Sequence, residues 1–178
     1  MDSRALYLLC LKENGLSAGQ AARLSRGERM LLEQREGKFF LKSSERVKFK
    51  VVLTGGAFDV LHIGHVLTLQ EARRLGDALV VVVARDETVE KRKGKKPIHD
   101  AEYRRSMVSA IKPVDLAIVG AGADWMETFS RVKPDIVVFG YDQSPIPLPD
   151  GCKSVHLHEI KADPALAKTS RIIRDLGL

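Results

Sequence analysis

Cysteine and long apolar runs are both scarce in this chain of 178 residues. The two cysteines, Cys10 and Cys152, are too few for a disulfide framework or a four-thiolate zinc site. The longest apolar block, residues 78–84, is far shorter than the ~18 residues that a membrane helix needs. The apolar stretch near the N-terminus is too short for a signal peptide. We therefore expect a cytoplasmic protein in a reducing compartment, without a membrane partner.

The excess of basic over acidic residues lies almost entirely in the first fifty positions. Residues 1–50 contain 11 Lys/Arg against 6 Asp/Glu, a net charge of +5, whereas residues 51–178 contain 18 against 17, a net charge of +1. A basic segment suits nucleic-acid binding, as in a nucleotide-sensing regulator. However, residues 26–35 mix arginines with Glu28 and Glu33, which favours a packing or dimerisation extension over a nucleic-acid partner.

Serine caps and a glycine break divide residues 1–48 into short elements. Ser17 and Ser25 occupy helix-capping positions, and Gly37 ends a helical pattern. We predict helices over residues 4–12, 18–24 and 26–35, followed by a strand over residues 38–42. This pattern predicts a small, mainly helical extension, similar to a truncated helix-turn-helix or winged-helix unit.

From residue 49 onward, apolar strand-like blocks alternate with helical segments. The predicted strands are residues 49–54, 78–84, 115–119, 135–139 and 153–158, and the predicted helices are residues 64–75, 101–111, 124–132 and 169–176. The alternation predicts an α/β fold over residues 49–178, a Rossmann-like doubly wound parallel sheet of about five strands. Ligands bind such sheets at the carboxyl ends of the strands. We therefore expect functional residues just after Thr54, Ala84, Val119 and Phe139.

The segment LTGGAFDVLHIGHVLTL, residues 53–69, carries the chemistry. It follows the first predicted strand of this sheet and opens a helix. Gly55 and Gly56 allow the backbone to turn tightly and approach a phosphate. His62 and His65 share one face of the helix start, where free N–H groups and the helix dipole favour anions. Incidental histidines in a glycine-rich turn are the alternative, and no acidic residue stands at zinc-ligand spacing. The strand–turn–helix context favours a polyphosphate site.

The string G-x-F-D-x-x-H-x-G-H in this segment resembles that of the cytidylyltransferase-like nucleotidyltransferases, and the resemblance runs from about Lys50 to Leu178. The family transfers a nucleotidyl group from CTP or ATP to a phosphate monoester and releases pyrophosphate. The resemblance implies that His62 and His65 hold the triphosphate and stabilise the charged transition state. It also implies a nucleotide-binding turn made by Thr54, Gly55, Gly56, Ala57, Phe58, Asp59 and Gly64.

A basic segment, residues 85–97, follows the second strand of the predicted sheet. It reads either as a solvated basic loop or as a mobile loop whose lysine closes over the triphosphate. The family has a lysine in this place, and we expect Lys91, or else Lys96, to act. We also expect Arg104 or Arg105 to reach the site, the alternative for both being a surface ion pair with Glu102 or Asp100.

Two later segments add nucleotide-binding candidates. Gly140, Asp142 and Gln143 follow the fourth strand, where they either contact the nucleotide or acceptor or form a polar turn. Lys168, Thr169 and Ser170 open the last predicted helix. The serine and threonine are helix caps in either interpretation, and the resemblance implies that they also bind the triphosphate.

Within the family, the strings VVVVARDETVEKRKGKKPI and RRSMVSAIKPVDLAIVG resemble those of the archaeal-type FAD synthases. The resemblance implies transfer of AMP from ATP to FMN, giving FAD and pyrophosphate. It also implies a divalent cation, Mg²⁺, held by phosphate oxygens without a dedicated protein metal site, and a homodimer. The tail ADPALAKTSRII differs from that subgroup, so a CTP-dependent alcohol-phosphate cytidylyltransferase is the alternative.

Overall fold

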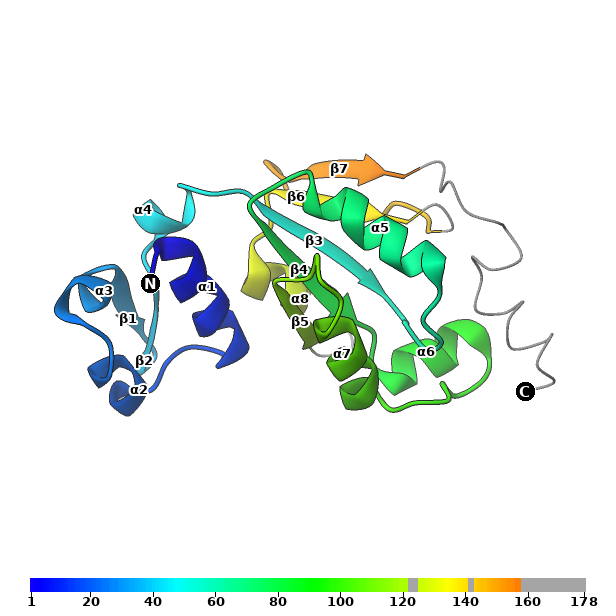
Figure 1. Ribbon diagram of the computed structural model, residues 1–178, viewed down its shortest axis with the longest axis horizontal. Helices are drawn as coiled ribbons and strands as arrows, with labels where there is room; N and C mark the ends of the chain where they lie inside the picture. Colours follow the sequence, from blue (N-terminus) through cyan, green and yellow to red (C-terminus); the bar gives the residue numbers. More distant parts are fainter. Residues whose placement is uncertain (122–124, 141–142, 158–178) are drawn as a thin grey trace. The chain divides into compact units, whose positions relative to one another are not determined.

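The computed structural model describes residues 1–121, 125–140 and 143–157 (Figure 1). The chain divides into two compact units, Met1–Lys50 and Val51–Leu178. Each unit is therefore described by itself.

The first unit has three short helices followed by a β-hairpin. Its elements are α1 (Ser3–Lys12), α2 (Ala18–Ala22), α3 (Arg26–Met30), β1 (Leu32–Arg35), β2 (Lys38–Leu41) and α4 (Ser43–Arg46). Ser17 and Ser25 begin α2 and α3 with capping boxes, as their positions predict. Helix α3 has only five residues, about 7.5 Å at 1.5 Å per residue, and none of them is buried.

The predicted helix over residues 26–35 is wrong in its second half, because residues 32–35 form β1. This strand pairs antiparallel with β2, and Leu32 faces Leu41, both buried. The turn consists of Glu36 and Gly37, both with positive φ (49° and 78°), a conformation that favours a tight hairpin. Strand pairing and burial of Leu32 thus override the local helical pattern.

The second unit is built on a five-stranded parallel sheet, which confirms the predicted fold class. The strands are β3 (Val51–Gly56), β4 (Ala78–Val83), β5 (Leu116–Val119), β6 (Ile136–Phe139) and β7 (Lys153–His156). Their order is β5-β4-β3-β6-β7, and every neighbouring pair is parallel. Almost every residue of β4 is fully buried, as its continuous apolar sequence predicts.

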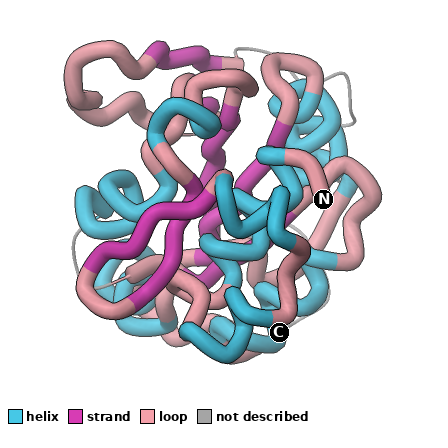
Figure 2. Tube along the Cα trace, turned by 90° about the vertical axis from the view of Figure 1, so that its left-hand side faces the viewer, coloured by secondary structure: helices cyan, strands magenta, loops and turns pink. Residues whose placement is uncertain are grey.

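Four helices of the described residues accompany this sheet: α5 (Ile63–Arg73), α6 (Asp86–Lys93), α7 (Ala101–Ser109) and α8 (Trp125–Val132). Strand order reverses between β3 and β6, so right-handed crossovers place α8 on the opposite face from α5 and α7, as Figure 1 shows. Figure 2 shows the strands, in magenta, running between helical segments. In such sheets ligands bind beside the reversal of strand order, which here is at the carboxyl ends of β3 and β6.

A loop was expected in the basic segment, but Asp86–Lys93 form helix α6. Asp86 and Glu87 stand in its first turn and its three basic residues in the last, so the charges complement the helix dipole. The helix ends at Gly94, which adopts the left-handed conformation at φ 69°. Only Val89 is buried. A single apolar residue leaves no periodic signal, which is why the sequence pattern did not indicate a helix.

Candidate functional site

The turn after β3 is packed closely against its neighbours. A Cβ on Gly55 would lie 3.3 Å from the Val82 carbonyl oxygen, and one on Gly56 would lie 3.0 Å from the Phe58 ring. Phe58 is 4% exposed and has φ 51°. The glycines are therefore needed for packing as well as for the approach of a ligand. Thr54, expected to contact the nucleotide, donates its hydroxyl to the Val138 carbonyl at 2.9 Å inside the sheet.

His62 and His65 lie together at the start of α5, as their three-residue spacing predicts. His62 is the N-cap residue, with φ −143° and ψ 170°. The two rings stack with centroids 3.8 Å apart and planes 22° apart, and the His65 ring lies 5.0 Å from that of Phe58. Gly64, between the histidines, is buried within the helix. The helix start therefore presents two imidazoles beside free backbone N–H groups.

His65 is neutral at physiological pH. Burial lowers its pKa to about 3, with smaller contributions from the positive charges of His62 and Lys93. Its Nδ1 is buried and has no hydrogen-bond partner among the described residues. A buried ring nitrogen without a partner is costly in a free protein. A phosphate oxygen here would accept a hydrogen bond from the ring when Nδ1 carries the proton.

The lowered pKa of His65 predicts a loss of stability in mild acid. The unfolded chain takes up the proton at about pH 6.5 and the folded chain only at about pH 3, so stability falls as pH drops through this window. Between pH 7 and pH 5 the loss is about 2 kcal/mol. Urea unfolding at both pH values checks it. His65→Asn should show a smaller drop by about this amount, and equal drops in the two proteins would contradict the assignment.

Lys93 is the residue of the basic segment whose charge bears on His65. It is the last residue of α6. The sequence favoured Lys91 and then Lys96, and all three lysines are exposed. The structure therefore adds Lys93 as a candidate that sequence reasoning missed. The run of neighbouring lysines gave no signal that could separate them, because the choice depends on where α6 ends.

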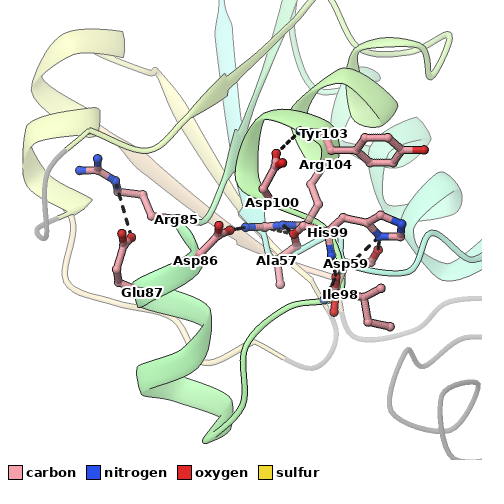
Figure 3. Close-up of polar contacts among 10 residues, drawn as sticks. All are labelled: Ala57, Asp59, Arg85, Asp86, Glu87, Ile98, His99, Asp100, Tyr103 and Arg104. Atoms are coloured by element: carbon pink, nitrogen blue, oxygen red, sulfur yellow. Dashed lines mark hydrogen bonds and ion pairs between the residues drawn. The ribbon is translucent and has the colours of Figure 1, made fainter. Parts of the chain in front are cut away.

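Asp59 was expected to bind the nucleotide, but its carboxylate accepts hydrogen bonds from the backbone of this chain. It is 6% exposed, and its Oδ1 accepts hydrogen bonds from the backbone N–H groups of Ile98 and His99 at 2.8 and 3.2 Å (Figure 3). The His99 ring Nδ1 lies 3.2 Å from the Asp59 carbonyl oxygen. Asp59 thus connects the turn at the end of β3, residues 54–59, to the segment that precedes α7. We call this turn the phosphate turn, after the ligand that the sequence predicts for it.

Arg104 and Arg105 are adjacent in sequence but differ in environment. Arg105 pairs with Glu102 at 2.7 Å on the surface, which is the alternative considered for it. Arg104 is fully buried and contacts the backbone of the phosphate turn at Ala57, with an Nη1–O distance of 2.5 Å (Figure 3). Sequence reasoning selected the pair but gave no sign of which arginine is buried, because both stand in a polar stretch.

Gln143 joins the carboxyl ends of β3 and β6. Its Oε1 accepts from the Gly140 N–H at 2.9 Å, and its Nε2 donates to the Gly55 carbonyl at 2.7 Å. The His156 Nε2 lies 2.8 Å from the Gln143 carbonyl oxygen. Both ends of the side-chain amide are therefore engaged with the backbone, so the residue ties the end of β3 to the end of β6, where a direct contact with the nucleotide was expected.

Replacing Gln143 with alanine should destabilise the protein by about 1–3 kcal/mol, because the buried Gly140 N–H and the Gly55 carbonyl lose their partner. Urea unfolding at pH 7 measures the change. Gln70→Ala, on the exposed face of α5, is the matched control and should change stability by less than about 0.5 kcal/mol. Equal effects of the two substitutions would contradict the role of Gln143.

Four expected nucleotide-binding residues, Asp142, Lys168, Thr169 and Ser170, lie outside the described residues. Within the described ranges, no group of three or more His, Cys, Asp or Glu residues is arranged to hold a metal ion. None of the described helices is both long enough and apolar enough to span a bilayer.

Three curated relatives are named FAD synthase. The protein of Aciduliprofundum boonei is 58% identical over 92 residues, and those of Thermoplasma acidophilum and Thermoplasma volcanium are 52% and 51% identical over 92 residues. The matched part is 52% of this chain and 61%, 64% and 64% of the three relatives, in that order. The chain thus spans less than two thirds of the length of the relatives it matches.

A solved structure extends the comparison to the fold. The crystal structure of the lipopolysaccharide core biosynthesis protein from Thermoplasma volcanium GSS1 matches with a TM-score of 0.51 at 40% sequence identity, covering 73% of this chain and 90% of that chain. The cytidylyltransferase-like family model matches residues 53–171, which include the phosphate turn, both histidines and the basic helix. By this match over more than half of its residues, the chain belongs to the cytidylyltransferase-like family.

Proposed function

We propose that this protein transfers AMP from ATP to FMN, forming FAD and pyrophosphate. The observation that carries the proposal is the identity of 51–58% over 92 residues to archaeal proteins named FAD synthase. The site supports it, because two stacked imidazoles, a helix N-terminus and a lysine-bearing helix suit a triphosphate. The family match supports the reaction class.

The proposed reaction is a direct displacement. A phosphate oxygen of FMN attacks the α-phosphorus of ATP, the new P–O bond forms, and the bond to the β-phosphate breaks to release pyrophosphate. Negative charge grows on the leaving pyrophosphate in the transition state. Preorganised donors and cations that face this charge lower the barrier, and no covalent enzyme intermediate is needed.

Each residue of the site has its own role in the proposed reaction. Neutral His65 donates a hydrogen bond to a phosphate oxygen, and His62 does so from the N-cap position. Gly55 and Gly56 let the backbone come close to the phosphates. Lys93 stabilises the leaving pyrophosphate. Mg²⁺ enters as part of the substrate, bound to the triphosphate oxygens.

The proposal also covers the domain division, the role of residues 1–48, the cellular compartment and the oligomeric state. The catalytic domain comprises residues 49–178, and residues 1–48 form a packing or dimerisation extension without a nucleic-acid partner. The short α3 supports this, because about 7.5 Å of helix offers little surface to a DNA groove. The enzyme acts in the cytoplasm as a homodimer. Sedimentation of the full chain tests whether it is a dimer.

A substrate panel tests the proposed function. The full-length protein is incubated with Mg²⁺, either ATP or CTP, and either FMN or glycerol phosphate, and pyrophosphate and FAD are measured. FAD and pyrophosphate are expected with ATP and FMN only. Pyrophosphate released from CTP and glycerol phosphate, with none from ATP and FMN, would instead establish the alcohol-phosphate cytidylyltransferase.

A further inference from the structure

We propose that Arg104 is a positioning residue for nucleotidyl transfer: its buried guanidinium ties the start of the basic helix α6 to the turn after β3, which fixes where α6 and its basic last turn lie. This inference rests on the proposed function. Arg104 itself lies on α7 and is fully buried, so it acts through the elements that it joins.

The guanidinium of Arg104 contacts three segments that are distant in sequence (Figure 3). It donates from Nη1 to the Ala57 carbonyl in the phosphate turn at 2.5 Å, and from Nη2 to the Asp86 carboxylate at the start of α6 at 2.5 Å. It also donates from Nε to the His99 carbonyl at 2.9 Å. A planar guanidinium presents donors in a fixed geometry, so these bonds also fix the distances between the segments.

Asp59 provides a second attachment for the same part of the chain. Arg104 holds the segment at Asp86, and the Asp59 carboxylate holds it again at Ile98 and His99. Between these ties, α6 buries only Val89. A helix with so little apolar contact has weak packing to hold it in place. Its position therefore depends on the polar tie at its first residue, Asp86, and on the tie at Ile98 and His99, which lies beyond its end.

The position of α6 matters because its last turn carries three cations, Lys91, Arg92 and Lys93. The charge of Lys93 also contributes to lowering the pKa of His65. If the tie at Asp86 is lost, α6 can shift or fray while the sheet and the histidines stay in place. A displacement of about 1 Å at a reacting group can cost about 100-fold in rate. The effect should appear in kcat, because Lys93 acts on charge that develops in the transition state.

Steady-state kinetics with ATP and FMN test the proposal. Arg104→Gln should lower kcat about 100-fold and change the KM for ATP by less than about threefold. Arg104→Lys should recover activity to within about tenfold of the wild type, because a lysine still reaches Asp86 but cannot make all three bonds. Arg105→Gln, at the neighbouring surface position, is the matched control and should stay within about twofold.

A double-mutant cycle with Lys93→Ala separates positioning from a general structural role. If Arg104 acts through Lys93, Arg104→Gln should cost less than about threefold more in the Lys93→Ala background. The same loss in both backgrounds would overturn the proposal. Asp86→Asn covers the case in which Arg104→Gln fails to fold, because the Asp86 side chain is 40% exposed. It should lower kcat about tenfold and show the same non-additivity.

Hydrogen exchange supplies a readout that needs no activity. In the free protein, Asp86→Asn and Arg104→Lys should speed exchange of the α6 amides at least about tenfold, with β3 and β4 unchanged. If the wild type makes no FAD, the proposed function fails, while this exchange still decides whether Arg104 holds α6. Unchanged exchange in α6 would overturn the tie whatever the substrate.

Discussion

Alanine in place of His65 is expected to lower kcat for FAD formation by about 1,000-fold, the largest effect of any substitution considered. In the proposed reaction the neutral imidazole donates to a phosphate oxygen whose charge grows in the transition state, and removal of one such donor costs about 100- to 1,000-fold. The buried position of His65 adds to this, because a donor shielded from water interacts more strongly with charge. Release of pyrophosphate from ATP and FMN at pH 7.5 measures the rate.

An asparagine at position 65 separates the effect of lost side-chain volume from the effect of a lost hydrogen-bond donor. His65→Asn fills part of the space and keeps a side-chain N–H, so it should retain more activity than His65→Ala. Unfolding in urea at pH 7 controls for the fold. A His65→Ala protein that remains folded and keeps more than about a tenth of wild-type activity would show that the histidine does not stabilise the transition state.

Lys93→Ala is expected to lower kcat by about 100-fold, the same fall as that expected for Arg104→Gln. A cation beside the leaving pyrophosphate stabilises charge that is absent from the ground state, so the loss falls on kcat more than on KM. The same substitution should also raise the pKa of His65, because the charge of Lys93 contributes to lowering it. Titration of the His65 ring by NMR in the free protein measures that change independently of activity.

Lys91→Ala is the informative comparison, since Lys91 lies on the same helix and is the residue that the sequence favours. If Lys93 acts, Lys91→Ala should lose clearly less activity than Lys93→Ala and should leave the pKa of His65 as it is in the wild type. A larger loss in Lys91→Ala would return the catalytic role to Lys91. A loss shared equally by the two would indicate that the triphosphate meets only the general positive charge of α6.

Local sequence signals predicted the elements that form the site. The helix predicted over residues 101–111 is present as α7, and the Asp100 side chain caps it by accepting from the Tyr103 N–H. The apolar strand blocks and the glycine-rich turn predicted the parallel sheet and the place of the two histidines. These features depend on residues that are near one another in sequence, which is why pattern alone was sufficient.

The features that pattern missed depend on contacts between distant residues. Residues 32–35 pair with β2 through a hairpin, although their sequence continues a helical pattern. The burial of Arg104 depends on acceptors 5, 18 and 47 positions away. Gln143 was expected to bind a ligand, yet its amide is engaged with Gly140 and with Gly55, 88 positions away. A polar residue in a loop does not reveal from sequence whether its partner is a ligand or the backbone.

The two ties around α6 also bear on how this enzyme could be re-engineered. Asp86 and Ile98 are held by Arg104 and Asp59, whereas residues 87–97 between them contribute little to the core apart from Val89. We therefore expect that the length and charge of this stretch can be changed while the sheet keeps its packing. In the proposed reaction, libraries confined to residues 90–96 would vary the cations offered to the triphosphate. Because ATP and CTP carry the same triphosphate, such changes should alter the rate with both nucleotides and leave the choice between them to other residues.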